Sequence, residues 1–192
     1  MKTITRIVLI VGLHFLILFT ALIAFQNIFT KIFEEKHNYS IGPFLFIFNY
    51  GVFMLANLFA PLIHFSSKWL ISLSALGYAC QYSVGIFISD LDGFMQYFIA
   101  AIGASIAGVF ASILWVNVGT YIHDACHFYN QIEKKGHYFG LFTTLYSFSL
   151  ITGSLVVTFG LSLMEEQPYF ILVTAIAVLA FVFSAIFMKD VE

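Results

Sequence analysis

The chain has 192 residues, of which 61% are hydrophobic and only 9% are charged. Its mean hydropathy of +0.96 lies far above that of soluble globular domains. A net charge of -2 with eight Lys and Arg residues provides no clustered cations to neutralise phosphates, which excludes nucleic-acid binding. The composition therefore predicts an integral membrane protein.

Six apolar stretches free of charged residues are each long enough to cross a bilayer as a helix, which takes about 20 residues. In chain order they cover residues 7–30, 44–65, 69–89, 94–122, 139–164 and 168–188. The first is roughly twice as long as the apolar region of a secretory signal, so we expect it to be retained as a helix. The sequence predicts one all-α transmembrane domain over residues 1–192.

Basic residues in the connections predict the orientation, because Lys and Arg accumulate on the side that is not translocated. With the N-terminus inside, the inner side holds Lys2, Arg6, Lys68, Lys134, Lys135 and Lys189. The outer side holds only Lys31 and Lys36. We therefore expect both termini to face inside.

An N-glycosylation acceptor triplet, Asn38-Tyr39-Ser40, lies in the first outer connection. That connection is short and would hold the acceptor close to the membrane, and the triplet is frequent by chance. The sequence leaves glycosylation of Asn38 open.

Small residues four apart occur in two rows within residues 94–122, and in lipid such residues allow the close backbone approach that helix association needs. One row holds Ala100, Ala104, Gly108 and Ser112, and the other holds Gly103, Ala107 and Ala111. We expect this surface to pack against neighbouring helices in the centre of the bundle. The general abundance of small residues in membrane helices is the alternative explanation.

A short internal sequence match links the first and fourth stretches, since Asn27 and Thr30 recur as Asn117 and Thr120. The first stretch runs outward and the fourth inward in the predicted topology. A true repeat would therefore be an inverted three-plus-three unit, as found within each half of a major facilitator. Chance is the alternative, because the match is short.

Several sequence pieces match those of one membrane protein family in order and spacing. They are Thr20-Ala21, Gln26-Asn27, Leu58-Phe59-Ala60-Pro61, Lys68-Trp69, Ala75-Leu76-Gly77-Tyr78, Leu114-Trp115, Gly119-Thr120-Tyr121-Ile122 and Tyr138-Phe139-Gly140-Leu141-Phe142. On these pieces the chain resembles the Unc-ninety-three-like ion channel regulatory proteins of the major facilitator superfamily. The resemblance implies a facilitator-type fold and a regulatory role. A complete member has twelve helices, so the six expected here would correspond to its N-terminal half.

The connection between the second and third stretches departs from the facilitator pattern. Facilitators usually place glycines, an acidic residue and paired basic residues there, whereas this chain reads His64-Phe65-Ser66-Ser67-Lys68. Because the acidic residue and the glycines are absent, the resemblance does not imply the gating contact that these residues make in facilitators.

Polar residues within the stretches are few, and no Asp, Glu, Lys or Arg lies deep inside one. Ion-coupled transport normally needs such a residue in the membrane, so its absence argues against that function. Gln26, Asn27, Asn117 and Thr120 are candidates for lining a solute path. Hydrogen bonding between helices is the simpler explanation for uncharged side chains.

The longest inner connection follows the fourth stretch. His123 and His127 are four apart and, together with Cys126, could hold a metal, although an ordinary hydrated loop is the simpler interpretation. Phe128 and Tyr129 would be exposed there and could dock a partner. The sequence contains no nucleophile elbow, phosphate loop or paired catalytic carboxylates, so we expect neither catalysis nor a cofactor.

Two functions fit these observations. The first is a non-enzymatic accessory protein that regulates or scaffolds a larger complex of integral membrane proteins in the lipid bilayer, an ion channel being one such partner. The second is a half-sized major-facilitator-type transporter of a small solute that acts as a homodimer. Either is a multi-pass membrane protein, in the surface membrane or in an organellar membrane such as the mitochondrial inner membrane.

Overall fold

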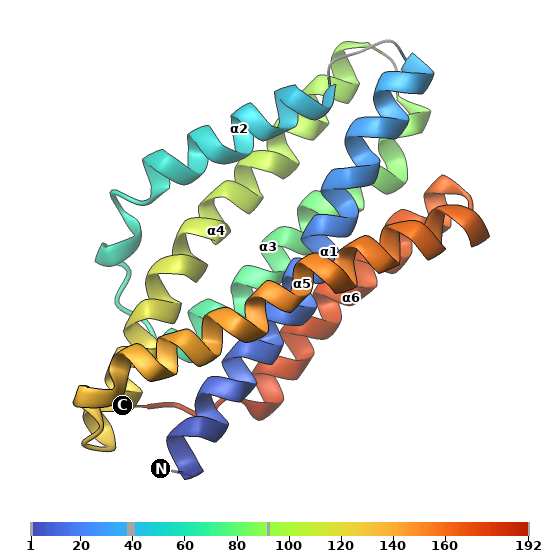
Figure 1. The fold of residues 1–192 in the computed structure, drawn as a ribbon. Helices are drawn as coiled ribbons and strands as arrows, with labels where there is room; N and C mark the ends of the chain where they lie inside the picture. Colours follow the sequence, from blue (N-terminus) through green and yellow to red (C-terminus); the bar gives the residue numbers. More distant parts are fainter. Residues whose placement is uncertain (1, 38–40, 92, 192) are drawn as a thin grey trace.

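The computed structural model describes residues 2–37, 41–91 and 93–191, and within these ranges the chain forms six α-helices and no strand. The helices are α1 (Lys2–His37), α2 (Ile41–Ala56), α3 (Ser67–Phe87), α4 (Phe94–Phe128), α5 (Lys135–Leu163) and α6 (Glu166–Phe187). They form the elongated bundle of Figure 1, which confirms the predicted all-α class. Asn38, the candidate glycosylation acceptor, lies outside the described residues.

Five helices within the described ranges are long and apolar enough to cross a membrane. Their spanning parts are Thr3–Phe29, Ser67–Phe87, Phe94–Phe128, Ile132–Gly160 and Glu166–Phe187.

The helix α2 is shorter than the apolar stretch 44–65 that contains it. The helix ends at Ala56, and a turn and the short 3-10 helix η1 (Ala60–Leu62) follow. Pro61 explains this difference, because its ring would clash with the carbonyl of Asn57 if the α-helix continued. Apolar length alone therefore overestimates the helix.

The irregular segment after α2 keeps backbone amides paired, as an apolar environment requires. The amide of Phe59 donates to the carbonyl of Ala56 at 3.0 Å, and the amide of Leu62 donates to the carbonyl of Phe59 at 2.9 Å. In addition, the Ser112 hydroxyl of α4 donates to the Asn57 side chain at 2.9 Å. The segment is therefore tied to α4.

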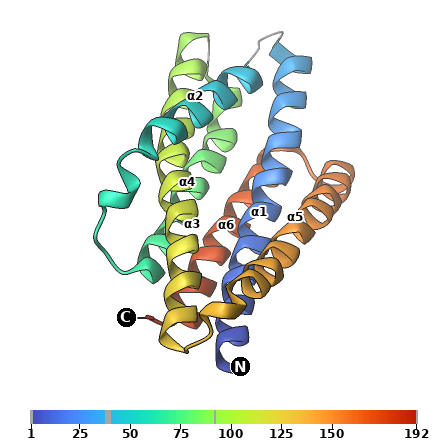
Figure 2. The same ribbon diagram turned by 60° about the vertical axis from the view of Figure 1, so that its left-hand side comes forward.

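The helix α3 packs against α6 in the middle of the bundle. On one side α4 packs on α3 and carries α2, and on the other side α1 packs on α6 and carries α5. Both chain termini lie at the same end of the bundle in Figures 1 and 2, and we call this the terminal end. The most apolar segment of α3 is 67% buried inside the bundle, whereas that of α5 is only 17% buried.

All seven small residues that form the two rows in α4 are buried. Two of them mark close contacts with neighbouring helices. A Cβ atom added to Gly108 would lie 2.6 Å from the carbonyl oxygen of Asn49 in α2, and one added to Gly103 would lie 2.6 Å from Cγ2 of Val84 in α3. The surface therefore lets α4 approach two helices closely.

Uncharged polar side chains also join the helices. Asn49 Nδ2 donates to Gln81 Oε1 at 3.1 Å and links α2 to α3. The Tyr169 hydroxyl donates to the Ala24 carbonyl at 3.0 Å and links α6 to α1. Such hydrogen bonds contribute about 1 kcal/mol each in membrane proteins, so they supplement the packing of small residues.

Replacing Gly108 with alanine should loosen the contact between α2 and α4, because the added Cβ would have to displace the Asn49 backbone. Overpacking of this kind costs about 1–3 kcal/mol and should lower the Tm in mild detergent. Gly119→Ala in the same helix is the matched control, since nothing lies within 4 Å of a Cβ added there. An unchanged Tm of Gly108→Ala, or an equal loss in both variants, would contradict the packing described.

Candidate functional site

One side of α5 faces the bundle. Its buried residues include Tyr138, Phe142, Ser149, Gly153 and Gly160. A Cβ added to Gly153 would lie 2.7 Å from Cβ of Ile23 in α1. Nearby, the hydroxyls of Thr20 in α1 and Thr152 in α5 lie 2.5 Å apart. These contacts fix the rotation of α5 about its own axis.

An aromatic cluster reinforces this orientation. The ring centroid of Tyr146 lies 4.9 Å from that of Phe19 in α1 and 5.7 Å from that of Trp115 in α4, both in edge-on geometry. The ring of Phe142 meets that of Phe15 in the same way at 4.8 Å. Edge-on pairs contribute roughly 0.5–1.5 kcal/mol each beyond their buried area. Trp115 therefore helps to hold α5 against α1 and α4.

The opposite side of α5 carries small and hydroxyl-bearing residues along most of its length. They recur mainly at intervals of three or four, which keeps them on one helical face. All of them are exposed: Gly140, Thr143, Thr144, Ser147, Ser154, Thr158 and Ser162. We call this row the α5 stripe, and the exposed side chain of Ile151 lies between its members Ser147 and Ser154.

Several hydroxyls of the α5 stripe are paired within α5 itself. Thr144 donates to the Gly140 carbonyl at 2.9 Å, and Ser154 donates to the Leu150 carbonyl at 2.8 Å. Paired hydroxyls can enter an apolar contact without leaving a donor unsatisfied. Sequence reasoning missed this surface, although the spacing of Ser and Thr residues was a visible signal.

The four residues predicted to line a solute path do not gather at one level. Gln26 and Asn27 lie toward the end of α1 that is remote from the termini, whereas Asn117 and Thr120 lie toward the terminal end of α4. At 1.5 Å per residue, the two pairs are about 20 Å apart along the bundle. Asn117 and Thr120 donate to carbonyls four residues earlier in α4, at 2.8 and 3.2 Å.

The predicted metal and docking residues lie at the terminal end of α4. His123 and His127 are exposed, whereas Cys126 is buried in the core, so the three side chains do not share a face. Among the described residues, no group of three or more His, Cys, Asp or Glu is arranged to hold a metal ion. Phe128 is 61% exposed, and Tyr129 is partly buried against the core.

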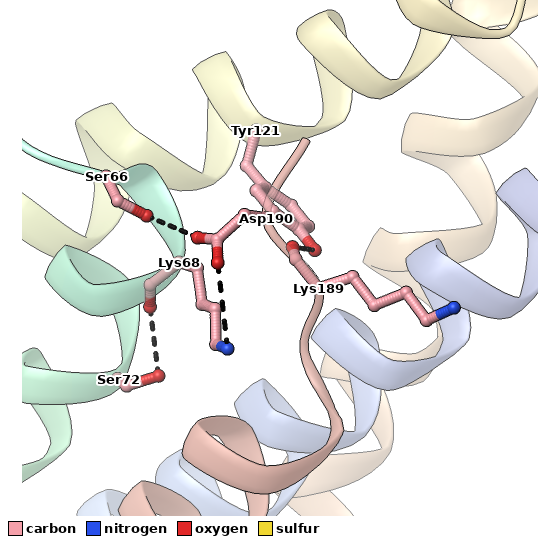
Figure 3. Close-up of polar contacts among 6 residues, drawn as sticks. All are labelled: Ser66, Lys68, Ser72, Tyr121, Lys189 and Asp190. Carbon is pink, nitrogen blue, oxygen red and sulfur yellow. Dashed lines mark hydrogen bonds and ion pairs between the residues drawn. The ribbon is translucent and has the colours of Figure 1, made fainter. Parts of the chain in front are cut away.

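A polar cluster at the terminal end ties Lys189 and Asp190 to α3 and α4 (Figure 3). The Tyr121 hydroxyl of α4 donates to the Lys189 carbonyl at 2.6 Å. The Ser66 hydroxyl donates to Asp190 Oδ1 at 2.7 Å, and Lys68 Nζ lies 3.9 Å from Asp190 Oδ2. We call these five residues the terminal clasp.

The terminal clasp places an acidic side chain beside the connection between α2 and α3, which contains no acidic residue of its own. Asp190 lies 124 residues after Ser66 in the chain, yet its carboxylate reaches the start of α3. There it meets both Lys68 and the positive end of the α3 dipole. The Asp190 side chain is 51% exposed, so the ion pair contributes only about 0–1 kcal/mol.

Removing the Tyr121 hydroxyl by Tyr121→Phe should lower the free energy of unfolding by about 0.5–1.5 kcal/mol, because the Lys189 carbonyl loses its donor. Tyr138→Phe is the matched control. The Tyr138 hydroxyl is buried with no hydrogen-bond partner among the described residues, so its removal should be neutral or stabilising. Thermal unfolding in one detergent compares the variants, and equal losses of stability would contradict the terminal clasp.

Comparison with known proteins identifies a family whose model matches the chain. The model of the ion channel regulatory protein UNC-93 family matches residues 36–189. This range holds α2 to α6 and leaves out most of α1, including the pieces Thr20-Ala21 and Gln26-Asn27. No curated protein and no solved structure matches the chain. Because the family match covers well over half of its residues, the chain belongs to the UNC-93 family of ion channel regulatory proteins.

Proposed function

We propose that this protein is a non-enzymatic accessory subunit that regulates or scaffolds another integral membrane protein, such as an ion channel, and docks through the α5 stripe. Membership of an ion channel regulatory family supports the regulatory role. The observation that carries the proposal is the row of exposed small residues on α5, a helix whose most apolar segment is only 17% buried inside the bundle.

The physical argument concerns what attracts helices to each other in lipid. Lipid tails are as apolar as leucine, so a bulky apolar face gains little by leaving them, whereas small residues let two backbones come close. From Gly140 to Ser162 the α5 stripe extends about 33 Å at 1.5 Å per residue, which matches a hydrocarbon core of about 30 Å. A partner helix laid along it would be flanked by Phe148, Leu155 and Phe159, which are 51%, 50% and 60% exposed.

The outward face of α2 differs from the α5 stripe in the size of its exposed side chains. Apart from Gly51, it presents large apolar side chains such as Ile47, Met54 and Leu55, which are 71%, 70% and 65% exposed. Both helices are exposed, so exposure does not distinguish them, but the size of the exposed residues does. We therefore assign the α2 face to lipid and the α5 stripe to a protein partner.

A half-sized transporter acting as a homodimer is the second candidate, and the helix packing supports its facilitator architecture. Exchanging α1 with α4, α2 with α5 and α3 with α6 maps the main contacts onto one another. The contact of α1 with α5 corresponds to that of α4 with α2, and the contact of α1 with α6 to that of α4 with α3. An inverted three-plus-three repeat has this relation.

The internal sequence match between α1 and α4 agrees with such a repeat. Asn27 lies 25 residues after the start of α1, and Asn117 lies 23 residues after the start of α4, so they occupy matching depths from opposite ends. In a homodimeric transporter the α5 stripe would take a second copy. Solute flux that is unchanged by Asn27→Ala and Asn117→Ala would contradict this second candidate.

Enlarging the α5 stripe should release the partner. In a Ser154→Leu/Thr158→Leu variant, the added bulk would hold the two backbones apart at a cost of about 1–3 kcal/mol, which corresponds to a loss of affinity of roughly 5-fold to 150-fold. Native size separation after mild detergent extraction, with mass spectrometry of the co-migrating chains, measures the effect.

Ala175→Leu is the matched control, because Ala175 is an exposed small residue on the spanning helix α6. We expect the control to migrate with the same stoichiometric partner as the unmodified chain. Retention of the partner by the double variant would overturn the docking surface. A complex made only of copies of this chain would favour the transporter candidate instead.

A further inference from the structure

A cavity of about 340 Å³ lies at the terminal end, between the start of α1 and the last residues of the chain. Its polar lining comes from Thr3 and Arg6 of α1, from Tyr121 of α4 and from Lys189, which follows α6. Its apolar lining includes Ile7 and Ile10 of α1. We propose that this cavity binds the phosphate group of an anionic phospholipid, whose acyl chain lies along the apolar lining.

The two cations of the cavity have no acidic partner among the residues that the structure describes. Within the described residues neither Arg6 nor Lys189 forms an ion pair, and no Asp or Glu lines the cavity. The neighbouring carboxylate of Asp190 is held by Ser66 and Lys68. Figure 3 shows the Lys189 side chain directed away from it, toward α1. A bound anion would relieve the repulsion between the two positive charges.

The donor groups suit a phosphate in particular. The guanidinium of Arg6 can donate two parallel hydrogen bonds to phosphate oxygens, while the ammonium of Lys189 supplies a compact charge. The Thr3 hydroxyl offers a further donor. The backbone of Lys189 is held in place, because its carbonyl accepts the hydrogen bond from Tyr121 at 2.6 Å. The two cations are therefore brought together from opposite ends of the chain by the fold.

The apolar lining distinguishes a lipid from a soluble phosphate. Ile7 is buried and Phe187 is 50% exposed beside the cavity, which gives an apolar surface that an inorganic anion would leave uncovered. The same end of the bundle holds most of the basic residues of the chain, and the positive-inside rule predicts that it faces inside. Basic pockets between helices on that side are suited to anionic head groups.

Native mass spectrometry of the purified protein with dioleoyl phosphatidic acid or dioleoyl phosphatidylcholine tests the proposal. We expect the unmodified chain to prefer phosphatidic acid. We expect an Arg6→Gln/Lys189→Gln variant to bind phosphatidic acid at least about tenfold more weakly, since each cation strengthens attraction to an anionic lipid. The charge-conserving variant Arg6→Lys/Lys189→Arg should keep most of the affinity, which shows that loss in the first variant is not misfolding.

Lys135→Gln removes a positive charge at the same end of the bundle but outside the cavity lining, so it should leave binding unchanged. An equal loss in Lys135→Gln would assign the effect to general surface charge and overturn the site. Equal binding of both lipids would also overturn it. Displacement of phosphatidic acid by millimolar inorganic phosphate, with binding of that phosphate alone, would overturn the lipid assignment in favour of a soluble anion.

Discussion

Close approach of helix backbones is the constraint on which this structure depends, because lipid supplies no hydrophobic force to bring apolar helices together. Glycine provides the approach at several of the helix contacts. Gly108 brings α4 to α2, Gly103 brings α4 to α3, and Gly153 brings α5 to α1. The α5 stripe has the same small-residue character, yet no helix of the bundle covers it. A partner helix would complete the pattern that holds the other helices together.

The terminal end obeys a different constraint, since polar backbone and charged groups meet water and head groups there. Lys189 and Asp190 are bound to α4 and to the start of α3 by the terminal clasp. Asp190 thereby supplies the carboxylate that the connection before α3 lacks. Because the same segment forms one wall of the basic cavity, a lipid bound there would join the start of α1 to the end of the chain.

The sequence predicts the helical class well, because the gaps between charged residues set the limits of most spans. Its failures concern contacts that depend on tertiary structure. Apolar length predicts a helix through residue 65, but Pro61 ends α2 at Ala56. Asp190 and Ser66 are 124 residues apart, so no local sequence pattern predicts the terminal clasp.

Both small-residue surfaces, by contrast, are visible as spacing in the sequence. Spacing alone does not reveal that other helices cover the rows of α4 and that none covers the α5 stripe. For a related reason, spacing does not reveal that the residues predicted to line a solute path lie at different levels of the bundle. Asn27 and Asn117 match in sequence, but the opposite directions of α1 and α4 place them at different depths.

The central claim, that the α5 stripe contacts a protein and the α2 face contacts lipid, is tested most directly by photo-crosslinking in the native membrane. A photoreactive amino acid at Ile151 samples the α5 stripe between Ser147 and Ser154, and the same group at Leu55 samples the exposed face of α2. The account predicts a discrete protein adduct from position 151 and lipid adducts alone from position 55. Lipid adducts alone from both positions would contradict it.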